Sequence, residues 1–280
     1  MGEPFIGSEA VATRRITPYQ LRSRFVCVYP NVYVPTGTEL TAAMRARAAW
    51  LWTRRRGVVA GQSAAALHGT KWVDACGPAE MLYDNRHVPR GLRSWSDRFA
   101  DDEIVTVRGV PTTSPARTAL DIACRRPVDR AVAEIDALAR ATHLKVADVE
   151  LLVERYPGRR GMKAAREALA LADAGAESPR ETWLRLLVIR AGFPPPQTQL
   201  KIYDDRYGVL VGEVDMGWEA VKVALDYEGE HHRMTRRVFN KDIRRSELIT
   251  ELGWIHVRVT VEDTPAVIVR RLQAAWDRRV

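Results

Sequence analysis

The chain has few cysteines and no long hydrophobic segment, and both shortages limit its class. Its 280 residues include three cysteines, which are odd in number, far apart and never in a CxxC pair: Cys27, Cys76 and Cys124. This pattern argues against a disulfide framework and against a zinc site. No apolar run approaches the roughly 20 residues of a membrane span. The start, MGEPFIGSEA, lacks a charged segment followed by an apolar core, so we expect a cytoplasmic protein without a membrane partner.

Positive charge is present in excess and is concentrated at the front of the chain. The formal net charge is +8, and the first sixty residues carry nine Arg against three Glu. A hydrophobic content of 46% is ordinary for a globular protein, and the length suits two or more domains. The charge therefore predicts a polyanionic partner, which we expect to be nucleic acid bound by the basic N-terminal part of the protein.

Two short helices and a hairpin are predicted at the N-terminus. Residues 8–15 have a helical pattern, and Thr17 can cap a second helix in which Pro18 occupies the first turn and Gln20 closes a capping box. Residues 25–35 read FVCVY-PN-VYVP, which predicts two strands joined by a Pro-Asn turn. This order is typical of a winged helix-turn-helix, which we expect over residues 1–36.

The second helix of that motif is expected to enter the major groove of duplex DNA. The predicted contacts to bases and phosphates are the polar and basic side chains of the helix pair: Arg14, Arg15, Tyr19, Gln20, Arg22 and Arg24. Arg and Gln are residue types that read base edges, and Arg also binds phosphates. Winged helices also serve as protein-binding modules, so that alternative stays open.

The middle of the chain is predicted to be structural. Residues 37–126 suit a mixed α/β region, which begins with a long helix over 38–56, and residues 127–176 suit a helical connector. His68, in a short Ala-rich helix, is interpreted as a structural residue. Arg117 and Asp121 are four residues apart on a predicted helix and are most simply an intrahelical ion pair.

Acidic residues gather on two predicted strands of the last hundred residues. The predicted element order over 177–280 is αβββαβα, and strands near 209–216 and 221–227 carry or lead into Asp215, Asp226 and Glu228. Hard oxygen ligands on neighbouring strands suit Mg²⁺ or Mn²⁺. The alternative is that these acids lie at solvated strand ends and pair with nearby arginines.

Five sequence blocks in this region carry a family resemblance. They are Ser178-Pro179-Arg180-Glu181, Val214-Asp215, the segment LDYEGEHH at 225–232, DIRR at 242–245 and GWIHVRVT at 253–260. Residues 177–260 thereby resemble the domain related to very-short-patch-repair endonucleases, within the restriction-endonuclease-like PD-(D/E)xK superfamily. The resemblance implies a C-terminal restriction-endonuclease-like αβββαβ sandwich, and an α/β (α+β) class for the whole chain.

The same resemblance implies roles for individual residues. Asp215, Asp226 and Glu228 would hold the divalent metal, and Glu181 would be a further catalytic residue, although Glu181 is also the third residue of a capping box that Ser178 opens. His232 would transfer a proton, and Lys241 and Arg245 would contact the phosphate or the transition state. The catalytic Lys of the superfamily is replaced by Glu228, and Lys222 lies on the same predicted strand face.

A second resemblance covers roughly residues 5–125. It rests on the helix and hairpin at 17–34, on SAAALHG at 63–69 and on PARTALD at 115–121. These segments resemble the winged-helix antitoxins of abortive-infection (AbiEi-type, type IV) toxin-antitoxin systems. The resemblance implies binding to promoter DNA, repression of the protein's own operon and a toxin-like protein partner.

Two functions from different classes follow. The first is a Mg²⁺-dependent (or Mn²⁺-dependent) DNA endonuclease or nickase that hydrolyses phosphodiester bonds in duplex DNA. The alternative is an antitoxin-like DNA-binding transcriptional repressor whose nuclease fold is inactive and serves interaction or homodimerisation. A third reading is a structural protein in which the acids only pair with arginines.

Overall fold

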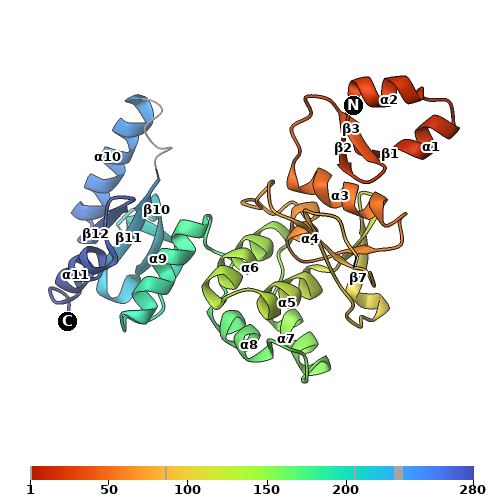
Figure 1. Ribbon diagram of the computed structural model, residues 1–280. Coiled ribbons are helices and arrows are strands. Elements are labelled where there is room, and N and C mark those ends of the chain that lie inside the picture. Colours follow the sequence, from red (N-terminus) through yellow and green to blue (C-terminus); the bar gives the residue numbers. More distant parts are fainter. Residues whose placement is uncertain (1, 86, 205, 230–235) are drawn as a thin grey trace. The chain divides into compact units, whose positions relative to one another are not determined.

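The computed structural model describes residues 2–85, 87–204, 206–229 and 236–280. The chain forms two compact units, Met1–Ala172 and Asp173–Val280, and each combines helices with β-sheet (Figure 1). The mixed α/β class is therefore as predicted, whereas the finer division into four domains stays a prediction. Within the described part of the chain, no helix has the length and apolar character that a membrane crossing requires.

The N-terminal segment contains the predicted helix pair and hairpin. Its elements are β1 (Phe5–Ile6), α1 (Gly7–Ala12), α2 (Pro18–Arg24), β2 (Phe25–Tyr29) and β3 (Val32–Pro35). The strands form an antiparallel sheet in the order β1-β3-β2. The capping box between Thr17 and Gln20 is present, and it fixes where α2 begins. Asn31, in the hairpin turn at a φ of 64°, accepts a hydrogen bond from the backbone N–H of Ser8 at 2.9 Å, so the turn is fastened to α1.

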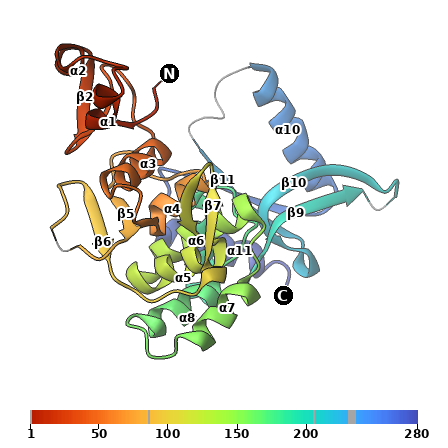
Figure 2. The ribbon, with the colours of Figure 1, turned by 90° about the vertical axis from the view of Figure 1, so that its right-hand side faces the viewer.

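A five-stranded sheet forms the middle of the first unit, where Figure 2 labels β5, β6 and β7, and its strand order is β6-β5-β4-β8-β7. Its strands and associated helices are α3 (Ala42–Trp52), β4 (Val58–Val59), α4 (Gly61–Leu67), β5 (Ala79–Leu82), β6 (Leu92–Trp95), η1 (Asp101–Glu103), β7 (Ile104–Val107) and β8 (Val110–Thr113). One hydrophobic core joins α3 and α4 to this sheet and to the N-terminal strands through buried residues such as Ile6, Tyr29, Leu51 and Met81.

The long helix predicted for residues 38–56 is shorter than expected. Thr41 caps α3 by accepting a hydrogen bond from the N–H of Met44 at 3.2 Å, and the helix ends at Trp52. Arg54 and Arg55 then adopt left-handed φ angles of 53° and 64°, a conformation that cannot continue a right-handed helix. The triple-arginine run therefore lies beyond the helix and does not occupy its last turn.

Four helices complete the first unit: α5 (Pro115–Arg125), α6 (Val128–Thr142), α7 (Val146–Arg155) and α8 (Met162–Leu171). Ser114 caps α5 and Pro115 occupies its first turn, as the sequence predicts. His68, which follows α4, lies with Nε2 at 2.8 Å from the carbonyl oxygen of Thr113. Burial lowers the pKa of His68, which suits a neutral structural histidine.

The second unit has the predicted αβββαβα order. Its elements are α9 (Pro179–Arg190), β9 (Gln197–Asp204), β10 (Val209–Trp218), η2 (Glu219–Val221), β11 (Val223–Glu228), α10 (Arg236–Glu251), β12 (Ile255–Thr260) and α11 (Pro265–Trp276). The sheet order is β12-β11-β10-β9, with β11 parallel to β12 and antiparallel to β10. One core cluster packs α9 and α11 on the sheet, and Ile249 of α10 belongs to another cluster, with β9, β10 and β11.

A buried ionic network centres on Arg117 of α5. Arg117 is 1% exposed, and its Nε donates to Asp121 at 3.0 Å while Nη1 donates to Glu103. Arg159 donates to Asp121 at 2.5 Å, and Tyr156 donates to Glu103 at 2.5 Å. The intrahelical pair predicted from spacing is therefore one part of a larger network that ties α5 to η1, α7 and the loop before α8.

We predict that Arg117→Met destabilises the first unit by about 3–5 kcal/mol, because it removes the buried cation shared by Glu103 and Asp121 and leaves only the partners at their edges, such as Arg155 and Arg159. Arg130→Met is the matched control. Arg130 pairs with Glu134 at 2.7 Å, but its side chain is 64% exposed, so we expect a loss of at most about 1 kcal/mol. Calorimetric unfolding of the full chain measures both variants. Equal losses would contradict the assigned role of the network.

Candidate functional site

The carboxylates of Asp215 and Asp226 lie together where β10 and β11 separate. Ladder pairing between these strands extends from Trp218–Val223 to Met216–Leu225. At the next position the Asp215 N–H donates to Oδ1 of Asp226 at 2.7 Å, and the Tyr227 N–H donates to Oδ2 of Asp215 at 2.6 Å. Side-chain oxygens thus take the hydrogen bonds that carbonyl groups accept in a continuous ladder. Two of the three predicted metal ligands, Asp215 and Asp226, are brought together by this geometry.

Asp226 is compensated by cationic and hydrogen-bonding partners. It is 4% exposed, and its Oδ2 accepts from Nη2 of Arg245 at 3.0 Å and lies 2.9 Å from Nε2 of His256. Burial favours a neutral carboxyl, but hydrogen bonds from His256 and from the Asp215 N–H, together with the charge of Arg245, hold the pKa of Asp226 below its usual value. Asp226 is therefore an anion at neutral pH.

Asp215 lacks equivalent compensation. Burial, followed by the negative charges of Asp226 and Glu181, raises the pKa of Asp215 to about 8. Within the described residues, no guanidinium donates a hydrogen bond to its carboxylate in the way that Arg245 does to Asp226. The pair consequently carries one negative charge near neutral pH, and a second negative charge requires a nearby cation.

Glu181 has the capping role that the sequence predicts, while its catalytic role stays a prediction. It is 8% exposed at the start of α9, where its N–H donates to the Ser178 hydroxyl at 3.2 Å. Its own carboxylate accepts from that hydroxyl at 2.8 Å and from the Glu177 N–H at 2.7 Å. Glu181 therefore closes the helix cap, and its negative charge also reaches Asp215.

Glu228 is engaged elsewhere. Its carboxylate accepts from Nε of Arg258 at 2.7 Å, so this predicted metal ligand is held in an ion pair with β12. The sequence predicted that Lys222 shares a strand face with these acids, and this prediction is wrong. Lys222 precedes β11 in a left-handed turn at a φ of 48°. Its Nζ lies 3.4 Å from the carbonyl oxygen of Leu252.

The remaining predicted site residues fall into two groups. His232 and the side chain of Lys241 lie outside the described residues. Arg245 is described, and it donates to the Glu213 carbonyl oxygen as well as to Asp226. Arg245 therefore fastens α10 to β10 and β11. It remains 31% exposed, so part of the side chain faces solvent.

His256 is a member of this cluster that sequence reasoning missed. It is 3% exposed as a side chain, and its Nδ1 lies 3.2 Å from the Ser246 hydroxyl of α10. His256 stands in β12, two positions from Arg258, which pairs with Asp226 in the parallel register. Alternation along GWIHVRVT could have placed its side chain on the face of Asp226, once β12 was known to neighbour β11.

Asp215 and Asp226 could supply two oxygen ligands to a divalent cation, which are fewer than a complete protein coordination shell. Among the described residues, no group of three or more His, Cys, Asp or Glu side chains is arranged to hold a metal ion. Asp215 and Asp226 alone suit a cation that keeps most of its water, as Mg²⁺ does. The raised pKa of Asp215 shows that positive charge at this point would be stabilising.

The predicted DNA-contacting residues lie on the N-terminal helix pair. Arg14 and Arg15 are exposed in the connection between α1 and α2, and Arg22 and Arg24 are exposed in the last turn of α2. Across the described part of the chain, no carboxylate within ion-pair distance is found for these four arginines. Tyr19 is 73% exposed on the same helix.

Gln20 is the exception among the six predicted contacts. Its Oε1 accepts from the Thr17 N–H at 2.8 Å, and its own N–H donates to the Thr17 hydroxyl at 3.1 Å. The side-chain oxygen of Gln20 is therefore used for the helix cap. Only its amide N–H groups are left to reach a base.

The pKa of Asp215 predicts a pH-dependent stability. Because the folded-state pKa is raised above the unfolded value, the contribution is largest below the unfolded pKa of 3.8 and is lost as pH rises toward about 8. We expect Asp215→Asn, which resembles the protonated form, to be increasingly stabilised relative to the wild type between pH 5 and pH 8. Thermal unfolding across this range tests the prediction. A constant difference between the two proteins would refute it.

Comparison with known proteins finds a family match for part of the first unit. Residues 57–171 match the family model of the AbiEi antitoxin C-terminal domain. The match confirms the antitoxin-like resemblance in part, and it includes α5 to α8, which the sequence reading treated as a connector beyond residue 126. It does not include the helix pair and hairpin of residues 5–35.

The relatives and a solved structure come from Mycobacterium tuberculosis. The chain is 35% identical over 177 residues to the uncharacterized protein MT2308 of strain CDC 1551 / Oshkosh and to the uncharacterized protein Rv2248 of strain ATCC 25618 / H37Rv. Each match covers 61% of this chain and 64% of the relative. The crystal structure of the RV2827C protein shows 15% identity and a TM-score of 0.40, covering 74% of this chain and 86% of that one. Residues 57–171 are thus similar to the AbiEi antitoxin C-terminal domain.

Proposed function

We propose that the protein is an antitoxin-like transcriptional repressor that binds duplex DNA through residues 1–36 as a winged helix-turn-helix. The observation that carries the proposal is the exposed basic surface of the helix pair, formed by Arg14, Arg15, Arg22 and Arg24. Arginines at such a surface suit phosphates and base edges. The match of residues 57–171 to an antitoxin domain supports the biological role.

The local structure supports a preformed DNA-binding element. The capping box at Thr17 fixes the start of α2, and Asn31 holds the hairpin turn against Ser8 through a second hydrogen bond, from Nδ2 to the hydroxyl, at 2.7 Å. Restricting helix and hairpin before binding lowers the entropic cost of association. A homodimer on two half-sites and a toxin-like protein partner belong to the same proposal.

We predict that Arg22→Gln and Arg24→Gln each weaken binding to a duplex from the protein's own promoter. Loss of a phosphate contact should also reduce the slope of log K against log salt by about one. Arg166→Gln, in α8, removes the same charge from another exposed arginine and should leave affinity and slope nearly unchanged. Fluorescence anisotropy over a salt series measures both quantities. No binding at moderate salt, or equal losses in all three variants, would remove the proposal.

A second candidate, a divalent-metal-dependent DNA endonuclease or nickase, rests on the convergence of Asp215 and Asp226. These two carboxylates would hold Mg²⁺ or Mn²⁺, which when bound would screen the scissile phosphate and activate a water. Arg245 orients Asp226, and His256 holds the same carboxylate in place. Glu228 in place of the superfamily's Lys, already paired with Arg258, favours the repressor over this candidate.

Plasmid nicking separates the two candidates. For the nuclease, we expect supercoiled DNA to be nicked in the presence of Mg²⁺ or Mn²⁺ and the activity to disappear in Asp215→Ala. Asp263→Ala is a suitable control, because Asp263 is a carboxylate of the same unit that pairs with Arg271 at 3.2 Å, outside the cluster. If the plasmid stays intact after incubation with the wild type, under conditions where the protein binds DNA, the nuclease candidate is excluded and the repressor candidate is retained.

A further inference from the structure

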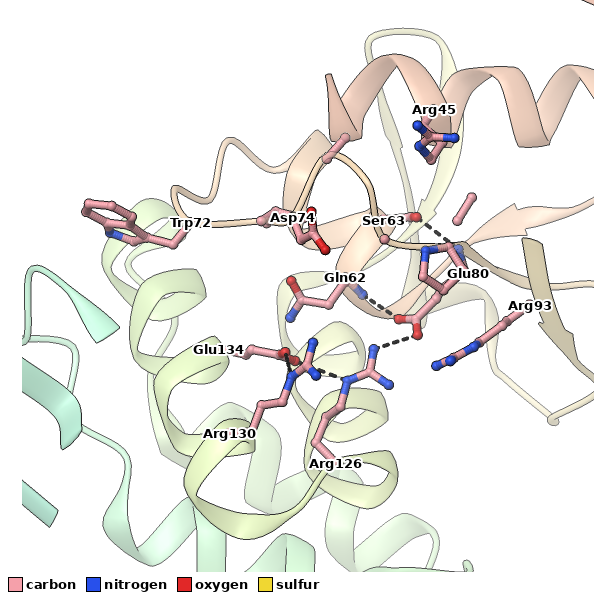
Figure 3. Close-up of a pocket in the computed structure, with 15 residues that line it drawn as sticks. Arg45, Gln62, Ser63, Trp72, Asp74, Glu80, Arg93, Arg126, Arg130 and Glu134 are labelled. Atoms are coloured by element: carbon pink, nitrogen blue, oxygen red, sulfur yellow. Dashed lines mark hydrogen bonds and ion pairs between the residues drawn. The ribbon is translucent and has the colours of Figure 1, made fainter. Parts of the chain in front are cut away.

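A polar pocket of about 250 Å³ in the first unit has no role in either proposed function. Figure 3 shows that α4, β5, β6 and the loop around Trp72 and Asp74 contribute to its walls, with α6 on the opposite side. The charged side chains that line it are Arg45, Arg93, Arg126, Arg130, Asp74, Glu80 and Glu134. Four cations therefore face three carboxylates, which leaves positive charge in excess.

Two of the three carboxylates of the pocket, Glu80 and Glu134, pair with arginines of the protein, and Asp74 accepts from the Cys76 N–H at 2.8 Å. Glu80 is 3% exposed and accepts from the Gln62 N–H at 2.9 Å and from Nη2 of Arg126 at 2.5 Å. Gly61, at a φ of 52°, permits this approach, because a Cβ there would lie 2.3 Å from Oε2 of Glu80. Glu134 accepts from Nε of Arg126 at 3.3 Å and from Nε of Arg130 at 2.7 Å.

Beside Glu80 and Arg126, the pocket has hydrogen-bond donors that the described part of the protein does not use. In the described structure, Nε2 of Gln62 is buried and has no hydrogen-bond partner. The backbone of Arg93 lies opposite that of Glu80 in the β5–β6 register. Figure 3 shows the Arg93 guanidinium extending into the space beside Glu80 and Arg126. Among the residues described, no carboxylate is found within ion-pair distance of Arg93. A ligand at this point must supply acceptors.

We propose that this pocket binds a small molecule through a phosphate or carboxylate group, which accepts hydrogen bonds from Arg93 and Gln62. A planar or tetrahedral oxyanion matches the fork of a guanidinium. The Glu80–Arg126–Glu134–Arg130 chain holds the pocket wall in place and does not compete for the ligand. None of the DNA-contacting residues of the helix pair lines the pocket, so the proposal is independent of the DNA-binding proposal.

Isothermal titration calorimetry of the full chain with inorganic phosphate, citrate and AMP tests the proposal, at an ionic strength of about 0.15 M to suppress nonspecific attraction. We expect binding that Arg93→Gln weakens about tenfold or more, as the loss of a charge-assisted hydrogen bond predicts. Arg90→Gln removes the same charge from a nearby exposed arginine that does not line the pocket, and it should bind as the wild type does. The relative affinities of the three probes distinguish phosphate from carboxylate recognition.

Gln62→Met provides a second variant with a different readout. It keeps the side-chain length and the backbone N–H that binds Glu80, but removes a buried donor that lacks a partner. We expect weaker oxyanion binding without a fall in melting temperature, because an unpaired buried donor does not stabilise the fold. Undetectable binding of all three probes by the wild type at millimolar concentration, or wild-type affinity in Arg93→Gln, would overturn the proposal.

Discussion

Burying a charged side chain is unfavourable unless an opposite charge and hydrogen bonds accompany it, and this constraint organises both units. In the first unit, Arg117 is surrounded by the carboxylates of Glu103 and Asp121 and by the aromatic ring of Tyr156. In the second, Asp226 is paired with Arg245 and His256, whereas the described residues give Asp215 beside it no such partner. The buried charges of Arg117 and Asp226 are therefore compensated, whereas a nearby positive charge would stabilise the ionised form of Asp215.

The same contrast separates structural arginines from candidate binding arginines in the first unit. Arg117 and Arg126 join helices and strands through buried or half-buried carboxylates. Arg22, Arg24 and Arg93 present their guanidinium groups to solvent or to a pocket. Because an unpaired guanidinium is a strong donor that accepts no hydrogen bond, these positions are where phosphate or carboxylate groups are recognised in the proposals made above.

In the second unit, a four-stranded mixed sheet is common to the repressor and nuclease readings, so the fold alone does not choose between them. The choice depends on side chains. Asp215 and Asp226 meet where the ladder opens, while Glu228 is neutralised by Arg258. Three carboxylate oxygens of Asp215 and Asp226 already accept hydrogen bonds from the protein, and these contacts hold β10, β11, β12 and α10 together.

The sequence by itself determined the local elements. The capping residues Thr17, Ser114 and Ser178, the turn at Asn31 and the alternation of β10 and β11 depend on neighbours within a few residues, and those elements appear where they were expected. Only the tertiary structure decided which distant groups meet. His256 reaches Asp226, Lys222 turns away, and Arg93 faces the pocket beside Glu80, because strand register and helix packing bring together residues separated by tens of positions. Sequence spacing carries no direct record of such contacts, and charge compensation in the interior depends on them.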